Sequence, residues 1–227
     1  MANERFSRQN KIGWFQQRKL KNVNVMIVGC GGIGCWTALQ LTMLGIRKIT
    51  LVDMDTIEES NLNRQFFYES DVEKFKVDAL KEKLNKINSK IIIETESKPV
   101  ESLDKGMYKN IHFVLDCLDN IKTREYLLNI CTELNIPFIH SACSDVIGEA
   151  QLVIKGKTPA LKYPEDMRKA DERRSCLDFD PAVITTNMIV ASLQVDKFLD
   201  YLMKKEIKNP FTHYIRGQGL SYGGNLK

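Results

Sequence analysis

The chain has 227 residues, of which 43% are hydrophobic and 27% charged, and it carries a formal net charge of +4. This length fits one domain with a substantial core, and so mild a charge, with basic and acidic residues interleaved, argues against a nucleic-acid-binding surface. No apolar run approaches the length of a membrane span, about 20 residues, and the segment before Val23 is polar. We therefore expect a cytoplasmic protein with no signal peptide and no membrane partner.

The first predicted elements form a β-turn-α-β unit. Residues 23–29 are a short apolar run that ends at Gly29, and residues 33–44 carry apolar side chains at helical spacing until Gly45 ends the helix. The apolar run at 48–53 predicts the next strand. Such a unit implies a parallel sheet with a right-handed crossover.

The same alternation continues along the chain. We predict, in order, a helix over 74–86, strands over 90–96 and 111–116, a helix over 123–134, and strands over 137–142 and 149–154. Residues 155–180 are charged and contain Pro, which predicts a long functional loop. A helix over 184–203 follows, with Thr185 or Thr186 as its N-cap, and the last ~20 residues carry no clear pattern.

Cysteines are spread through these elements, which is typical of reduced thiols that behave as small apolar residues. The six are Cys30, Cys35, Cys117, Cys131, Cys143 and Cys176. No C-x-x-C pair occurs, so a four-cysteine zinc site lacks its usual sequence support.

A glycine-rich turn, "GCGGIG", follows the first strand and precedes the first helix. It contains Gly29, Gly31, Gly32 and Gly34. Glycine lets the backbone approach a phosphate, and the start of the following helix offers free N–H groups and a partial positive charge. Asp53 ends the next strand and suits a ribose hydroxyl pair, so the pattern predicts an adenine nucleotide site. Two alternatives are glycines that serve only strand–helix packing, and an NAD-dependent dehydrogenase.

Four motifs in order carry a family resemblance. "GCGGIG", "LVDMDTIEESNLNRQ", "EKFK" and "VLDCLDNIKTR" together resemble the ThiF/MoeB/HesA family, bacterial relatives of ubiquitin-activating enzymes, over residues ~5 to ~200. Family members use ATP to adenylate a C-terminal carboxylate, most often on the Gly-Gly tail of a small ubiquitin-like or sulfur-carrier protein. The resemblance therefore implies an adenylyltransferase and makes hydride transfer the wrong chemistry.

The resemblance also implies the architecture. The expected fold is α/β, a Rossmann-like doubly wound and mostly parallel sheet with a C-terminal antiparallel extension. Residues 1–227 would form a single adenylation domain, with a nucleotide-binding half at about 20–145 and a crossover loop and carrier-binding part at about 146–227. The family assembly implied is a homodimer.

Adenylation by a carboxylate is limited by charge. The carboxylate is already ionised at neutral pH, so the site needs cations and a metal aimed at the phosphates rather than a general base. By the resemblance, Arg64 and Lys76 contact the phosphates, Arg8 reaches across from the partner subunit, and Asp119 holds Mg²⁺. The nucleotide-binding set implied is Gly29, Gly31, Gly32, Gly34, Asp53, Asp55, Asn61, Gln65 and Asn120.

Each of these assignments has a structural alternative. Lys74 stands two residues from Lys76 and is an alternative counterpart, and any of the basic residues can be a solvated surface side chain. The alternative for Asp119 is that it is a helix N-cap with no role in metal binding. Arg124 either supports Asp119 electrostatically or forms a surface salt bridge.

A second activity in many relatives uses a cysteine before the long C-terminal helix. Cys176 occupies that place here, where it would form a thioester or an acyl disulfide. The preceding Arg173 and Arg174 favour the thiolate, although acidic residues follow and some relatives only adenylate. Family members often carry zinc thiols where this chain has Ala160 and Tyr163, so we expect zinc to be absent.

Several functions remain open beside the activation of a Gly-Gly-ending carrier protein. They are a tRNA threonylcarbamoyladenosine dehydratase-like enzyme, a peptide-adenylating enzyme, and a catalytically inactive dimer partner. The modest charge argues against the tRNA enzyme, and the presence of Arg64, Lys76 and Asp119 together argues against the inactive partner.

Overall fold

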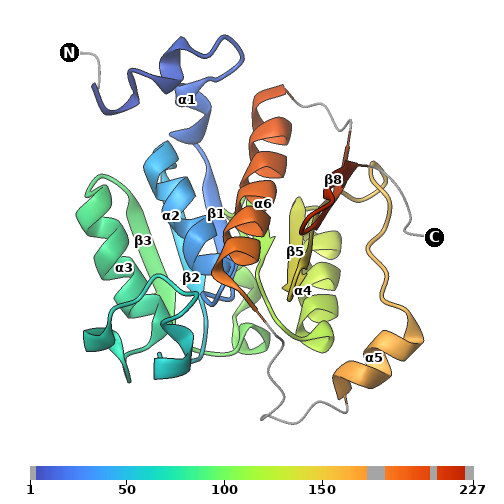
Figure 1. Cartoon of the computed structure of the whole chain (residues 1–227). Helices are drawn as coiled ribbons and strands as arrows, with labels where there is room; N and C mark the ends of the chain where they lie inside the picture. Colours follow the sequence, from blue (N-terminus) through green and yellow to red (C-terminus); the bar gives the residue numbers. More distant parts are fainter. Residues whose placement is uncertain (1–3, 173–181, 205–208, 223–227) are drawn as a thin grey trace.

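A computed structural model describes residues 4–172, 182–204 and 209–222 of the chain. The strands form one eight-stranded sheet in the order β3-β2-β1-β4-β5-β6-β7-β8 (Figure 1). The parallel strands are β1 (Asn24–Val28), β2 (Lys48–Val52), β3 (Ile92–Glu96), β4 (Phe113–Asp116) and β5 (Phe138–Ser144). The antiparallel strands are β6 (Ile147–Val153), β7 (Phe211–Ile215) and β8 (Gly219–Tyr222). The predicted α/β fold class with an antiparallel extension is confirmed.

Helices connect these strands. They are α1 (Gln17–Leu20), α2 (Gly34–Leu44), α3 (Lys76–Ile87), α4 (Ile121–Leu134), α5 (Glu165–Glu172) and α6 (Ile184–Lys204). Short 3₁₀ turns lie at Glu4–Phe6, Gln9–Lys11, Glu59–Asn61, Glu69–Asp71, Val100–Ser102 and Lys105–Tyr108. Gly45 ends α2 in the left-handed conformation (φ 81°), where glycine carries no steric penalty.

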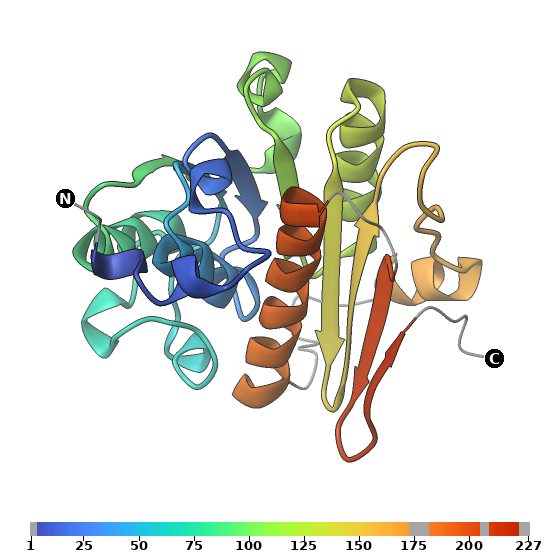
Figure 2. The same ribbon diagram turned by 90° about the horizontal axis from the view of Figure 1, so that it is seen from above.

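Two apolar layers cover the sheet. One contains Leu41 of α2, Leu80 of α3 and Phe198 of α6, packed on strand residues such as Ile27. The other contains Leu127 of α4, packed on the alternate strand residues, such as Met26, whose side chains lie on the opposite face of the sheet. Figure 2 shows α6 and α4 on opposite sides of the sheet. Because both faces are covered, the central strand β1 is buried along its whole length, which explains its unbroken apolar sequence.

Helix α6 joins the parallel and antiparallel parts of the sheet. It packs on β5 and β6 and also against α2. Its buried Gln194 donates through Nε2 to the carbonyl oxygens of Asp116, at 3.0 Å, and Ile139, at 2.9 Å. The Thr37 hydroxyl of α2 donates to Oε1 of the same Gln194 at 2.9 Å. A single amide therefore fixes α6, α2, β4 and β5 to one another.

The structure corrects three sequence predictions. Neither Thr185 nor Thr186 is an N-cap, because α6 already begins at Ile184, and the Thr186 hydroxyl donates instead to the Asp145 carbonyl at 2.9 Å. The expected loop over 155–180 contains α5, whose polar sequence hid its helical spacing. The unpatterned C-terminal residues form β7, which is partly buried, and β8, an exposed edge strand. Within the described ranges, no helix combines the length and apolar character that a membrane crossing requires.

Candidate functional site

The carboxyl ends of the parallel strands meet at one edge of the sheet, the lower edge in Figure 1. The chain leaves β1 through α2 toward β2 on one side, and β4 lies on the other side of β1. In open α/β sheets this change of direction opens a crevice in which ligands bind. The loops after β1, β2 and β4 surround this point.

The glycine turn after β1 packs closely against neighbouring backbone. Gly29 has φ +90°, and a Cβ there would lie 2.4 Å from the carbonyl oxygen of Cys117, in the loop after β4. A Cβ on Gly34 would lie 1.8 Å from the Gly29 carbonyl oxygen. Both positions therefore require glycine. Part of this requirement comes from packing of the turn against its own protein backbone, in addition to the predicted approach of the turn to a phosphate.

Two amide side chains border the turn. A Cβ on Gly31 would lie 3.7 Å from Gln65 Nε2, and one on Gly32 would lie 2.4 Å from Asn187 Nδ2, on the first turn of α6. Both amides are buried, and Gln65 Oε1 and Asn187 Oδ1 have no hydrogen-bond partner within the described structure. Gln65 was predicted. Asn187 was missed, because only the fold brings α6 to the turn.

Asp53 anchors the glycine turn from the end of β2. Its Oδ2 accepts a hydrogen bond from the Cys30 backbone N–H at 2.6 Å, and its Oδ1 accepts from the Asp55 N–H at 2.8 Å. Burial raises the pKa of the Asp53 carboxyl, although Lys76 opposes that shift. The carboxyl group thus orients the turn, and its contact with a ribose stays a prediction.

Lys76 is a buried cation at the start of α3. Its Nζ lies 2.7 Å from Asp55 Oδ2. Burial opposes its charge, but Asp53 and Asp55 outweigh that effect and raise the pKa of the Lys76 ammonium. Lys74, the alternative counterpart, pairs instead with Asp71 at 3.2 Å. Of the two lysines, Lys76 is the one that interacts with residues of the crevice.

The 61–65 segment lies across the start of α2. Trp36 Nε1 donates to the Arg64 carbonyl at 3.0 Å. Asn61 is buried and its Oδ1 accepts from the Glu58 N–H at 3.2 Å, so its side chain caps the start of the 3₁₀ turn that it ends. The Arg64 guanidinium donates from Nη1 to the Ser60 carbonyl at 2.7 Å. Both of its acceptors, this carbonyl and a neighbouring side-chain oxygen, belong to its own turn.

Asp119 lies at the surface in the loop after β4, whereas Asp116, the last residue of β4, is buried. Asn120, not Asp119, is the N-cap of α4, because its Oδ1 accepts from the Thr123 N–H at 2.8 Å. The N-cap alternative for Asp119 is thus wrong. Arg124 is buried and lies 3.8 Å from Asp116 Oδ2, so the alternative of a surface salt bridge is also wrong.

One predicted residue lies away from this group, and another lies outside the described residues. Arg8 is exposed in the N-terminal segment, where the neighbouring Phe6 contacts Gly45 at the far end of α2. The eleven residues of α2 separate that edge of the sheet from the glycine turn. The prediction for Arg8 already placed it in the site of a partner subunit. Cys176 lies outside the described residues.

Four of the five described cysteines have thiols shielded from solvent, whereas Cys143 is only partly buried. Burial raises the pKa of the Cys35 thiol to about 12, and burial together with Asp116 raises that of Cys117 to about 12. Burial likewise raises the thiol pKa of Cys30 and Cys131. These thiols are therefore protonated and poor nucleophiles at neutral pH.

The crevice fits a phosphate-bearing ligand better than a bare metal ion. The glycine cradle and the start of α2 suit an anion. Within the described ranges, no group of three or more His, Cys, Asp or Glu side chains is arranged to hold a metal. Mg²⁺ bound with a nucleotide takes only one or two protein carboxylates, a demand that the exposed Asp119 can meet.

Comparison with known proteins identifies the family. The pattern that defines the ThiF family matches residues 6–221. The chain belongs to the ThiF family. This assignment confirms the resemblance that the four motifs predicted.

Known proteins resemble the chain over much of its length. Ubiquitin-like modifier-activating enzyme 5 of Dictyostelium discoideum is 32% identical over 205 residues, covering 82% of this chain and 54% of that protein. Adenylyltransferase and sulfurtransferase uba4 of Aspergillus clavatus is 36% identical over 163 residues, covering 69% of this chain and 32% of that protein. The chain thus spans about half or less of these two relatives. The crystal structure of E. coli MccB with succinimide is 25% identical, with a TM-score of 0.81, covering 99% of this chain and 71% of that chain.

Proposed function

We propose that this chain is an ATP-dependent adenylyltransferase that activates the C-terminal carboxylate, ending in Gly-Gly, of a small ubiquitin-like or sulfur-carrier protein. The observation that carries the proposal is the convergence of the glycine turn, the 61–65 segment and the Asp119 loop at one edge of the sheet. The names of the two curated relatives, an activating enzyme for a ubiquitin-like modifier and an adenylyltransferase, support the reaction and the substrate class.

The reaction joins two negatively charged partners. An oxygen of the carrier carboxylate forms a bond to the α-phosphorus of ATP, and the bond from that phosphorus to pyrophosphate breaks, so that pyrophosphate leaves with the electron pair. No proton has to be removed from the carboxylate at neutral pH. The protein must therefore supply positive charge and N–H donors at fixed positions.

The crevice has residues for these tasks. The glycine turn and the start of α2 receive the phosphates. Arg64 rests on acceptors of its own turn and reaches a phosphate oxygen by a change of rotamer, whereas Lys76 is a fixed cation beside Asp55. Gln65 brings a buried amide with an unused oxygen to Gly31. Mg²⁺ held by Asp119 would neutralise part of the phosphate charge when bound.

The rest of the predicted assembly is also proposed. Arg8 acts in the site of a second subunit of a homodimer, because α2 separates it from the crevice of its own chain. Residues of about 20–145 bind the nucleotide and about 146–227 the carrier. In a second step, the thiolate of Cys176 attacks the acyl carbonyl of the adenylate; the new C–S bond forms a thioester and AMP leaves.

Exchange of labelled pyrophosphate into ATP tests the first step. The assay uses the full chain, Mg²⁺ and a panel of purified ubiquitin-like and sulfur-carrier proteins, each with and without its terminal Gly-Gly. Exchange should require Mg²⁺ and an intact Gly-Gly end. Arg64→Ala should lower the exchange rate about a hundredfold, whereas Arg47→Ala, an exposed arginine before β2 at the opposite sheet edge, should not. Equal exchange in both variants would remove Arg64 from the mechanism.

Activation of a peptide is the second candidate. It is favoured by the extent of the likeness to E. coli MccB, which includes a structure with ATP that is 26% identical, has a TM-score of 0.78 and covers 98% of this chain. MccB has also been crystallised with MccA. Exchange that is supported by short synthetic peptides and not by any carrier protein would select this candidate.

A further inference from the structure

A buried amide on the first turn of α6 is satisfied at one end only. The side chain belongs to Asn187, which is 4% exposed. Its Nδ2 donates a hydrogen bond to Cys143 Sγ, on β5, at 3.3 Å. Its Oδ1 accepts no hydrogen bond from any described residue. The bond to the sulfur therefore fixes which end of the amide points toward β5 and leaves the oxygen without a donor.

Such an oxygen weakens the fold unless a ligand uses it. A buried acceptor without a donor loses its hydrogen bond to water and gains nothing in return, whereas an apolar side chain of the same shape avoids that loss. The surroundings on α6 are themselves apolar. Val190 and Ala191, three and four residues further along the same helix face, pack on Ile33. Packing alone would thus favour leucine over Asn187 at this position.

The amide lies against the glycine turn. A Cβ on Gly32 would stand 2.4 Å from Asn187 Nδ2 and 3.8 Å from its Oδ1, so the missing side chain of Gly32 makes room for the amide. Helix α6 packs on β5 and β6, which lie on one side of β1, whereas β2 lies on the other side. Asn187 therefore reaches the turn from the side opposite to Asp53.

The chemistry of the oxygen limits what it can bind. It needs a hydrogen-bond donor, and the phosphates of ATP offer acceptor oxygens. The ribose hydroxyls are donors, but the ribose is expected at Asp53, across the turn. The acyl substrate carries a backbone N–H on its last residue, two bonds from the carboxyl carbon that reacts. It would arrive from the part of the chain at about 146–227, to which α6 belongs.

We propose that Asn187 is a positioning residue for the acyl substrate, and that its Oδ1 accepts a hydrogen bond from the backbone N–H of the substrate's last residue. This bond holds the terminal carboxylate at the glycine turn. The inference rests on the proposed function and applies to a carrier protein and to a peptide alike, since both present this N–H. A chain end that lacks the N–H should be a poor substrate even though its carboxylate is intact.

Pyrophosphate exchange with two matched substrates tests this contact in the parent protein. The carrier protein or synthetic peptide that supports exchange best is prepared with its last residue either unchanged or replaced by the matching α-hydroxy acid. An ester oxygen then replaces the terminal N–H. The replacement should lower kcat/KM for exchange at least about tenfold, because Oδ1 is left facing an oxygen. Equal kcat/KM for the two substrates would overturn the proposal.

Two variants separate the oxygen from the rest of the amide. Asn187→Leu removes the acceptor, so exchange with the unchanged substrate should fall at least about tenfold and the preference for the N–H should disappear. Asn187→Asp keeps an acceptor oxygen and loses the Nδ2 donor. It should keep the preference, although its negative charge near the phosphates slows exchange. A preference that survives in Asn187→Leu, or that is lost in both variants, would overturn the role of Oδ1.

Asn88→Leu is the matched control, because Asn88 is an equally buried amide at the opposite edge of the sheet. It follows the end of α3, and its Nδ2 donates to the Thr42 carbonyl at 3.3 Å. Asn88→Leu should unfold at a lower urea concentration than the parent and keep the substrate preference. Asn187→Leu should unfold at the parent's urea concentration, since the oxygen that it removes has no donor.

The possible failures can be told apart. If Asn187→Leu is unstable and keeps the preference, Asn187 is a structural residue and the proposal is overturned. If that variant does not fold, the two substrates still decide the question in the parent protein. A parent protein that exchanges pyrophosphate with no carrier protein or peptide would overturn the proposed function, and this inference with it.

Discussion

The parallel and antiparallel parts of the sheet are built by different means. Around β1, β2 and β4, the loops touch through backbone atoms and buried charges, as where Gly29 meets Cys117 and Asp53 accepts from Cys30. Around β6, β7 and β8, the outer edge is a hairpin whose last strand is exposed along its length. The contrast indicates that atomic positions are most tightly fixed where the candidate site lies, while the antiparallel part leaves one strand edge accessible.

The largest expected effect breaks the backbone contact in the parallel part. Gly29→Ala places a Cβ against the Cys117 backbone at a positive φ, and we expect it to lower the free energy of unfolding by about 3 kcal/mol or more. Gly217→Ala is the matched control in the β7–β8 turn, where φ is +82° and no atom lies within 4 Å of the new Cβ. It should cost only about 1 kcal/mol. Urea denaturation measures both, and equal losses would remove the contrast.

A smaller effect comes from the buried cation. Lys76→Met removes the cation that pairs with Asp55 and that opposes the effect of burial on Asp53, and it should cost about 2 kcal/mol of unfolding free energy. Lys74→Met removes a half-exposed cation from Asp71, which keeps its ion pair with Lys83, and should stay within about 0.5 kcal/mol. Thermal and urea denaturation of the two variants side by side would show the difference. A larger loss for Lys74→Met would contradict the assignment.

The buried thiols give the parallel part a pH dependence. Burial raises the pKa of Cys35 in the folded protein to about 12, so its contribution is fully present below the pKa of the unfolded thiol and is lost as pH rises toward the folded value. Above about pH 9, stability should fall by up to about 1.4 kcal/mol per pH unit for this thiol. Urea denaturation between pH 8 and 10.5 measures the slope. Cys35→Ala should have a shallower slope, and an unchanged one would exclude this thiol as the cause.

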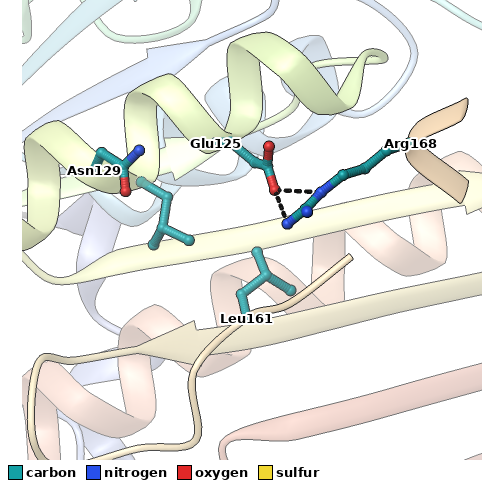
Figure 3. A pocket seen from close by; sticks show the side chains of 5 residues that line it. Glu125, Asn129, Leu161 and Arg168 are labelled. Atoms are coloured by element: carbon teal, nitrogen blue, oxygen red, sulfur yellow. Dashed lines mark hydrogen bonds and ion pairs between the residues drawn. The ribbon is translucent and has the colours of Figure 1, made fainter. Parts of the chain in front are cut away.

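The smallest effect concerns the segment that leads from the antiparallel part back to α4. Arg168 of α5 pairs with Glu125 of α4 at 2.6 Å, and both side chains line a pocket of about 380 Å³ (Figure 3). The pair is substantially exposed, so Arg168→Ala should cost no more than about 0.5 kcal/mol. Limited proteolysis of the 155–172 segment, which accelerates if α5 leaves α4, is the more sensitive measurement. Unchanged cleavage would show that the pair does not hold α5.

Local sequence patterns predicted most of the parallel part. The apolar run of β1, the helical spacing of α2 and the glycine turn depend on neighbouring residues, and each formed as predicted. The site residues Gln65 and Lys76 also lie at the crevice, although their roles remain proposals.

What the sequence did not reveal depends on distant partners. β8 is exposed and forms only by pairing with β7, so it has no alternating pattern. For Arg124 the sequence left open both support of Asp119 and a surface salt bridge, because its partner Asp116 is fixed by the fold rather than by helical spacing. Asn187 gave no sequence signal, since its neighbours at the turn come from other elements.

The indole contact at the start of α2 also gives the protein an optical reporter. The chain has two tryptophans; Trp36 donates to the Arg64 carbonyl, whereas Trp14 is 42% exposed in the N-terminal segment. If Arg64 turns toward a phosphate, the surroundings of only one fluorophore change. Emission from Trp36, with Trp14 quenched by iodide, would then follow nucleotide capture in real time without any label.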